Sequence, residues 1–387
     1  MAQGPGSWWT LPGPHRLVEA VADDLDQGRC VVVRLPQHLP SGFYEAVARQ
    51  LAWCSSQPQR WRQVTPQAFA GETDDDLLDW LYGRFELENE DFVQDKSLGH
   101  LCCQSVFQGS RVLLQQLQAA AASLWCRFLL SYQHELQNHQ LINRTTFLLI
   151  LEGDTTSLAP TPDANLTVHS YGEHTTVDDT RLFLRFASAT SGEPPLVSHV
   201  RQAIAVALAP ADPVLALRLV QQPLATLLQP LAYLADHARC CGWETNPDAL
   251  ALPEPPPAVA TALWAAGSWA RLENRPCLHS AVWALHTRVD QLQSRIWEGQ
   301  LTVLLPFLEQ RRHCLLLHYK SELEGMLPHT KKVGNSTETV HELAELELGD
   351  LYYLRTKPQL ARHASFGPEV TLLRSCRIEL AHQRPVK

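Results

Sequence analysis

Two residues near the end of the sequence are of types that act on phosphate esters. Arg377 and His382 lie within residues 372–382, whose apolar spacing predicts a helix. An imidazole titrates near neutral pH, and a guanidinium matches the geometry of a phosphate. Five residues of helix rotate about 500°, so the two side chains lie about 140° apart unless the helix loosens between them. The alternative is that Arg377 pairs with a nearby carboxylate and His382 caps the helix end.

A second candidate site lies between a strand expected at residues 30–35 and a helix expected at residues 43–51. Ser41 and Gly42 directly precede that helix. Backbone N–H groups at a helix N-terminus bind anions, so this position is compatible with a weak anion site. The loop contains no lysine, and its two prolines lack amide donors.

Two carboxylates follow a second apolar strand, expected at residues 146–151. Glu152 and Asp154 come directly after it. Their residue type allows a role at a nucleotide site, where a carboxylate follows a strand. The alternative is that they belong to an ordinary polar loop at a strand end.

Histidines and cysteines do not form a recognisable metal motif. His169 and His174 have a spacing of five, which is poor for two ligands on one helix face, and no Cys-x-x-Cys occurs. Several of the ten cysteines lie in apolar runs, which favours buried, reduced thiols and a cytoplasmic protein. We therefore expect no metal site.

The elements that would position these residues form a regular pattern in the first half of the chain. Continuous apolar strands separated by helices predict an α/β domain with a mainly parallel sheet covered on both faces. The expected strands are residues 30–35, 146–151 and 181–186, with helices at 13–25, 43–51 and 112–137, a loop or hairpin at 154–180 and helices from residue 198 onward.

The second half is expected to be an all-α bundle. The proline cluster at residues 253–257 is the strongest linker candidate and divides the chain into domains 1–257 and 258–387. Pro306 is expected to kink or divide a long helix, and Thr337 to cap the next one. The expected helices are residues 258–272, 279–305, 307–327, 337–355 and 368–382.

The distribution of charge supports that division. The whole chain carries 32 basic and 41 acidic residues, a net charge of −9. Residues 1–259 hold 16 basic and 28 acidic residues, a net of −12, whereas residues 260–387 hold 16 and 13, a net of +3. The acidic half argues against a uniformly basic nucleic-acid binder, and the second half leaves RNA open as a partner.

The succession of strand, loop and helix over residues 13–190 resembles a degenerate P-loop ATPase of the AAA or STAND kind. A working loop reads Gly-x-x-x-x-Gly-Lys-Ser/Thr, and this chain lacks the lysine. The resemblance puts Ser41 and Gly42 in the phosphate loop and Glu152 or Asp154 in the position of the Walker B carboxylate. It implies no ATP hydrolysis and no cofactor beyond a weakly bound nucleotide.

Residues 260–387 resemble a HEPN domain, an all-α family whose ribonucleases carry Arg-x4–6-His near the start of the last long helix. The resemblance implies a metal-independent endoribonuclease formed by two protomers. His382 would act as general acid or base at the ribose 2′-hydroxyl or the leaving oxygen, and Arg377 would stabilise charge on the phosphoryl group. Active members usually have a polar residue directly after the arginine, and here Ile378 follows.

Together the two resemblances imply a component of a bacterial anti-phage defence system, in which a HEPN-like RNA-cleaving effector is coupled to a degenerate nucleotide-binding domain. The alternative is a non-catalytic scaffold or adaptor that assembles with a separate ATPase or nuclease. The expected partners are a second copy, through the C-terminal helices, or another subunit of a defence complex, with RNA as a further candidate. The uncharged apolar runs are too short for a membrane span, and the first residues lack a secretory pattern.

Overall fold

A computed structural model describes residues 5–54, 60–64, 71–87, 96–187, 192–243, 255–273, 275–333 and 336–387. The N-terminal part is built on a five-stranded, all-parallel sheet with the strand order β2-β3-β4-β1-β5. The strands are β1 Cys30–Leu35, β2 Arg60–Val64, β3 Ser110–Leu114, β4 Thr146–Glu152 and β5 Leu166–Ser170. The expected α/β class with a parallel sheet is confirmed.

Successive residues of the central strands face opposite sides of the sheet, and both sides are apolar. Val31 and Val33 of β1 face one hydrophobic core, and Cys30 and Val32 face another. The helices of the first side are α1 Pro12–Asp26 and α2 Phe43–Cys54; those of the second are α3 Asp74–Arg84, α4 Leu98–Cys103 and α5 Ala119–Leu136. This double cover explains why the central strands are apolar without alternation.

Three sequence predictions in this part are wrong. Residues 181–186 belong to helix α6, Val177–Ala187, because Thr180, Phe183 and Leu184 form its buried stripe. The fifth strand, β5, lies inside the segment expected to be a loop or hairpin. The long helix expected from residue 112 begins only at Ala119, because residues 110–114 form β3.

A layer of helices follows the sheet and belongs to the same core as α1 and α2. Its helices are α7 Pro195–Leu208, α8 Pro213–Val220, α9 Leu224–Leu228, α10 Leu231–Cys240 and α12 Ser280–Leu285. Between α10 and α12 the chain forms α11 Pro257–Ala265 and the hairpin of β6 Trp269–Leu272 with β7 Arg275–Leu278. The prediction of a helix at 258–272 is therefore wrong for its second half, which contains β6.

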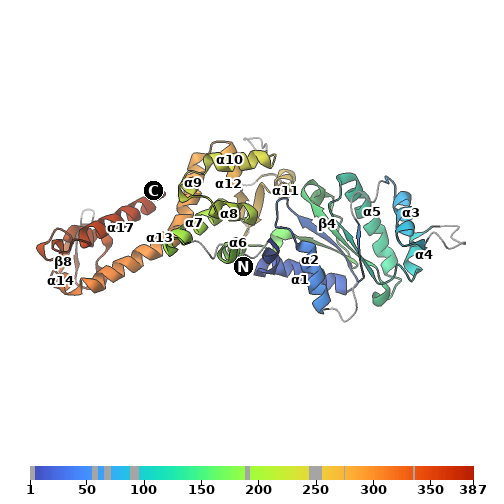
Figure 1. The fold of residues 1–387 in the computed structure, drawn as a ribbon, viewed down its shortest axis with the longest axis horizontal. Coiled ribbons are helices and arrows are strands. Elements are labelled where there is room, and N and C mark those ends of the chain that lie inside the picture. Colours follow the sequence, from blue (N-terminus) through green and yellow to red (C-terminus); the bar gives the residue numbers. More distant parts are fainter. Residues whose placement is uncertain are drawn as a thin grey trace.

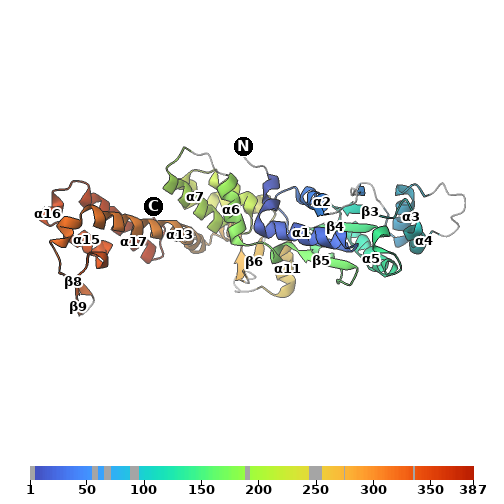
Figure 2. The same ribbon diagram turned by 90° about the horizontal axis from the view of Figure 1, so that it is seen from below.

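The longest helix, α13 Val289–His318, leads from this layer to a separate C-terminal cluster (Figures 1 and 2). Its first half packs in the first core through Leu292 and Ile296, and its second half packs in a third core from Leu308 onward. Of the kink or division expected at Pro306, the division is wrong, because α13 is continuous through that exposed residue, and the kink stays a prediction. The contacts with the third core begin before that residue, because the partly buried Trp297, Leu301 and Leu304 already pack against it.

The C-terminal cluster is mainly helical, as expected. It contains α14 Lys320–Glu324, α15 Leu348–Leu354, α16 Pro358–Ala361 and α17 Phe366–Ala381, with a hairpin of β8 His329–Val333 and β9 Ser336–Val340. Thr337 lies in β9 and caps no helix, so the helix expected at 337–355 begins only at Leu348. Pro253 and Glu254 lie outside the described residues, and the domain boundary at 257 stays a prediction. Among the described residues, no helix is long and apolar enough to cross a membrane.

Candidate functional site

The structure brings the loop after β1 next to the segment after β4. Leu35 and Glu152 are partners in the register of the two strands, so both segments leave the sheet at its carboxyl edge. Ser41 and Gly42 lie at the end of the β1 loop, residues 36–42, immediately before α2. The four residues predicted for a nucleotide site therefore come from adjacent loops, as the order of the strands requires.

The β1 loop is nevertheless filled and fastened by protein groups. The side chain of Gln37 covers Gly153, where an added Cβ would lie 2.5 Å from Gln37 Nε2. The Gln37 N–H donates to the carbonyl of Ala265 at 3.0 Å. At the far end of the loop, the buried Trp9 indole donates to the carbonyl of Ser41 at 3.1 Å. A phosphate-binding loop needs open space and free N–H groups, and this arrangement reduces both.

Both carboxylates after β4 are exposed, and Glu152 contributes to the local structure through its backbone. Glu152 caps the short 3-10 helix η5, Gly153–Leu158, and its N–H donates to Thr155 Oγ1 at 2.9 Å. Asp154 lies in the first turn of η5, where a negative charge is favourable.

The structure does not bring Arg377 and His382 together. Arg377 Nη1 lies 2.6 Å from Glu309 Oε1 on α13, and Arg377 Nη2 lies 3.9 Å from Glu347 Oε2. Helix α17 remains regular through Ala381, and His382 follows as its exposed C-cap. The two side chains therefore keep their helical separation of about 140°.

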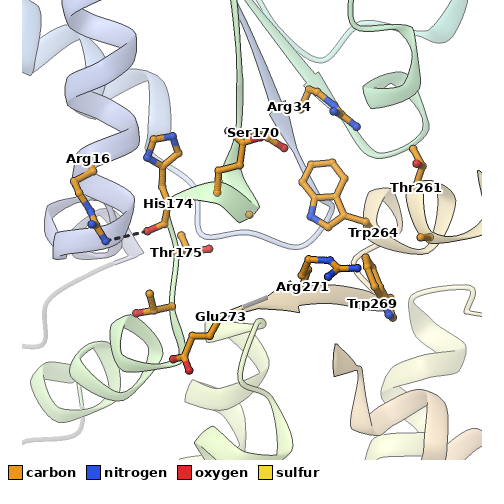
Figure 3. Close-up of a pocket in the computed structure, with 14 residues that line it drawn as sticks. Arg16, Arg34, Ser170, His174, Thr175, Thr261, Trp264, Trp269, Arg271 and Glu273 are labelled. Carbon is orange, nitrogen blue, oxygen red and sulfur yellow. Dashed lines mark hydrogen bonds between the residues drawn. The ribbon is translucent and has the colours of Figure 1, made fainter. Parts of the chain in front are cut away.

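A cavity lies at the carboxyl ends of β1 and β5. Its volume is about 650 Å³. Figure 3 shows Arg16 and His174 on one side of this cavity and Trp264 on the other. Trp269 and Arg271, from β6, complete the second wall. We call this cavity the arginine–tryptophan pocket.

The arginines of this pocket come from three different elements. Arg34 is the second-to-last residue of β1, and its Nε is buried with no hydrogen-bond partner among the described residues. Its guanidinium carbon lies 5.3 Å from the centre of the Trp264 ring. Arg16, on α1, donates to the carbonyl of His174 at 3.4 Å. Burial lowers the pKa of His174, so this imidazole is neutral at pH 7 and offers both a donor and an acceptor.

A second polar site, the Asp212 cluster, consists of Asp212, His237 and His279. Asp212 Oδ2 lies 3.6 Å from His237 Nε2 and 3.7 Å from His279 Nε2. Asp212 Oδ1 accepts the N–H of Leu215 at 2.8 Å and so caps α8. Burial alone would raise the pKa of the Asp212 carboxyl, but the two imidazoles and the Leu215 N–H hold it well below its ordinary value.

The three potential ligand atoms of the Asp212 cluster lie within 4.8 Å of one another, close enough for one metal ion. The hydrogen bonding of His279 argues against this use. Its Nδ1 accepts the N–H of Ala281 at 3.1 Å, so in the neutral ring the proton resides on Nε2. A histidine that binds metal through Nε2 instead donates from Nδ1. The residues present therefore do not fit a metal ion.

Cys241 lies next to the cluster but does not complete a nucleophilic triad. Its Sγ is 3.6 Å from His237 Nε2, the same nitrogen that faces Asp212. A relay needs the two partners on opposite ring nitrogens. Burial also raises the pKa of the Cys241 thiol to about 11, so the thiol remains protonated at pH 7.

Sequence reasoning missed both sites. Arg34 gave a signal, since it is the single charged residue at the end of an apolar strand. His174 lies in the segment expected to be a loop or hairpin, and Trp264 and Trp269 lie in the helix expected at residues 258–272. Asp212 and His279 are the N-caps of α8 and α12, and His237 lies in α10, so the cluster has no short spacing that a motif could capture.

Comparison with known proteins adds no family to this description. No protein-family model matches the chain, and no curated protein sequence matches it.

Proposed function

We propose that this chain is a non-catalytic binding and adaptor protein, with the α/β part as a ligand-binding platform and the C-terminal helices as an assembly module. The observation that carries the proposal is the filled β1 loop. Gln37 occupies the space beside Gly153, and Trp9 binds the carbonyl of Ser41. Nucleotide hydrolysis needs that space and a lysine, and the loop has neither.

The surroundings of Arg377 support the same choice. Its guanidinium is shared between Glu309 and Glu347, so a phosphate would have to compete with two carboxylates. RNA cleavage through Arg377 and His382 stays a prediction of the HEPN resemblance. Membership of an anti-phage system, with a separate ATPase or nuclease as partner, belongs to our proposal as well. The C-terminal cluster at the far end of α13 offers a module distinct from the α/β platform (Figure 1).

The test uses the purified full-length chain. We expect no release of inorganic phosphate from ATP and no RNA cleavage above a protein-free blank. Light scattering after co-expression with the products of flanking genes is expected to detect a complex or a homo-oligomer. This assembly should survive both Arg377→Ala and His382→Ala. Catalytic turnover, or a strict monomer without any bound partner, would contradict the proposal.

A further inference from the structure

We propose that the arginine–tryptophan pocket binds a nucleotide, with its phosphate near Arg34 and its base near Trp264 and Trp269. The inference rests on the proposed non-catalytic binding function and names the ligand class. It moves nucleotide binding from the β1 loop to a neighbouring cavity on the other side of β1.

The position and size of the pocket fit a small ligand. Ligands of open α/β sheets bind outside the carboxyl ends of the strands, which is where Arg34 and Ser170 lie. The volume of about 650 Å³ falls within the range of small-molecule sites. The walls also come from α1 and from the segment 260–273, so the ligand would be enclosed by parts of the chain far apart in sequence.

The charges of the pocket favour an anion. The buried Arg34 Nε has no partner among the described residues, and leaving such a donor unsatisfied costs free energy. Arg16 makes one long bond to a carbonyl. The acidic residues, Glu173 and Glu273, are exposed at the rim. A phosphate beside the Arg34 guanidinium would form charge-assisted bonds with it, and Arg16 in the opposite wall adds a second positive charge to the cavity.

The aromatic residues select the second part of the ligand. Trp264 and Trp269 are half-buried in the wall opposite Arg16. Tryptophan faces stack on nucleobases, and stacking tolerates any base because every base has a π-face. Arg34 already lies over the Trp264 ring, so phosphate and base contacts would adjoin. A phosphate joined to an aromatic base is a nucleotide.

Isothermal titration calorimetry with each of the four ribonucleoside monophosphates tests this inference. We expect saturable binding of at least one, and at least tenfold weaker binding of the matching nucleoside and of inorganic phosphate. Arg34→Gln should weaken the binding at least tenfold, since a charge-assisted hydrogen bond is lost. Arg49→Gln, on the exposed surface of α2, and Ser41→Ala, in the β1 loop, should bind as the unaltered chain does.

Several results would overturn the inference. The first is the absence of any binding heat with each monophosphate at millimolar concentration. The second is an affinity of Arg34→Gln equal to that of the unaltered chain, and the third is loss of binding in Ser41→Ala. The fourth is binding of single-stranded oligonucleotides without binding of monophosphates. Thermal unfolding of each variant checks that it is folded. Phosphate release from ATP would contradict the proposed non-catalytic function while leaving the binding result valid. If no phosphate is released from ATP and no monophosphate binds, this inference is refuted and the proposed non-catalytic function is not.

Discussion

Removal of the negative charge of Asp212 tests how the Asp212 cluster holds the helical layer together. Asp212 is 7% exposed, and its carboxylate faces the imidazoles of His237 on α10 and of His279 at the N-cap of α12. Asp212→Asn removes the charge but keeps an oxygen that can accept the Leu215 N–H and cap α8. Asp212→Ala removes the charge and the cap together. The pair therefore separates the two roles.

The expected magnitude follows from the distances. A hydrogen bond to a charged group contributes about 1.5–3 kcal/mol. Both imidazole contacts of Asp212 are longer than a hydrogen bond, at 3.6 and 3.7 Å, so we count the two together as about one such bond. We therefore expect Asp212→Asn to lower the free energy of unfolding by about 2 kcal/mol. Loss of an N-cap costs about 1 kcal/mol more, which gives about 3 kcal/mol for Asp212→Ala.

The cluster also predicts how stability depends on pH. Burial lowers the pKa of His279 in the folded chain, with repulsion from His237 acting in the same direction. Below the ordinary pKa of about 6.5, the unfolded chain therefore binds a proton that the folded chain does not. Stability should fall as pH decreases from 7 to 5. The contribution of Asp212, whose folded pKa is also lowered, is present above about pH 4 and is lost only below it.

His279→Asn isolates this effect. Asparagine keeps a side-chain acceptor for the Ala281 N–H but does not titrate. The decrease of stability between pH 7 and 5 should become smaller, without vanishing, because burial also lowers the pKa values of His38 and His174. Urea unfolding followed by circular dichroism at several pH values measures both predictions. Equal stability of Asp212→Asn and the unaltered chain, or an unchanged pH slope in His279→Asn, would refute the reasoning.

Two further predictions concern other parts of the chain. An added Cβ at Gly299 of α13 would lie 2.8 Å from the carbonyl oxygen of Ala203, so Gly299→Ala should lower the free energy of unfolding by about 1–3 kcal/mol. Gly349→Ala, with no atom within 4 Å, should raise it by up to about 1 kcal/mol; equal effects in urea unfolding would contradict both. Arg377→Ala should lower the free energy of unfolding by less than about 1 kcal/mol, because the ion pairs that it removes are partly exposed. Neither it nor His382→Ala should change the background level in an RNA cleavage assay, and a decrease would favour the ribonuclease prediction.

The sheet could be predicted from sequence where its strands are buried on both faces. β1 and β4 are short, continuous apolar runs, and such runs indicate central strands of a parallel sheet. β5 was missed because it lies at the edge and reads Leu-Thr-Val-His-Ser, with only Leu166 fully buried. α6 was mistaken for a strand because a short apolar run has no clear period, and only its packing decides between helix and strand.

The candidate sites were harder to predict from sequence than the strands, because their residues come together only in the tertiary structure. The β1 loop could be located because strand, loop and helix are consecutive in the chain. Its filled state could not be predicted, because Gln37 meets Gly153 and Ala265 only after folding. The pocket at Arg34 could not be predicted either, because Trp264, which forms part of its wall, lies more than 200 residues later in the sequence.

One segment of the chain contacts the β1 loop and also lines the arginine–tryptophan pocket. Residues 257–279 supply the Ala265 carbonyl that binds the Gln37 N–H, and the turn at Gly267 approaches the Gln37 carbonyl so closely that an added Cβ would lie 3.0 Å away. The positive φ of 75° at Gly267 also favours glycine. The same segment contributes Trp264 to the pocket. The fastening of the β1 loop and the wall of the pocket therefore depend on one packing arrangement, and a change that displaces this segment should alter both together.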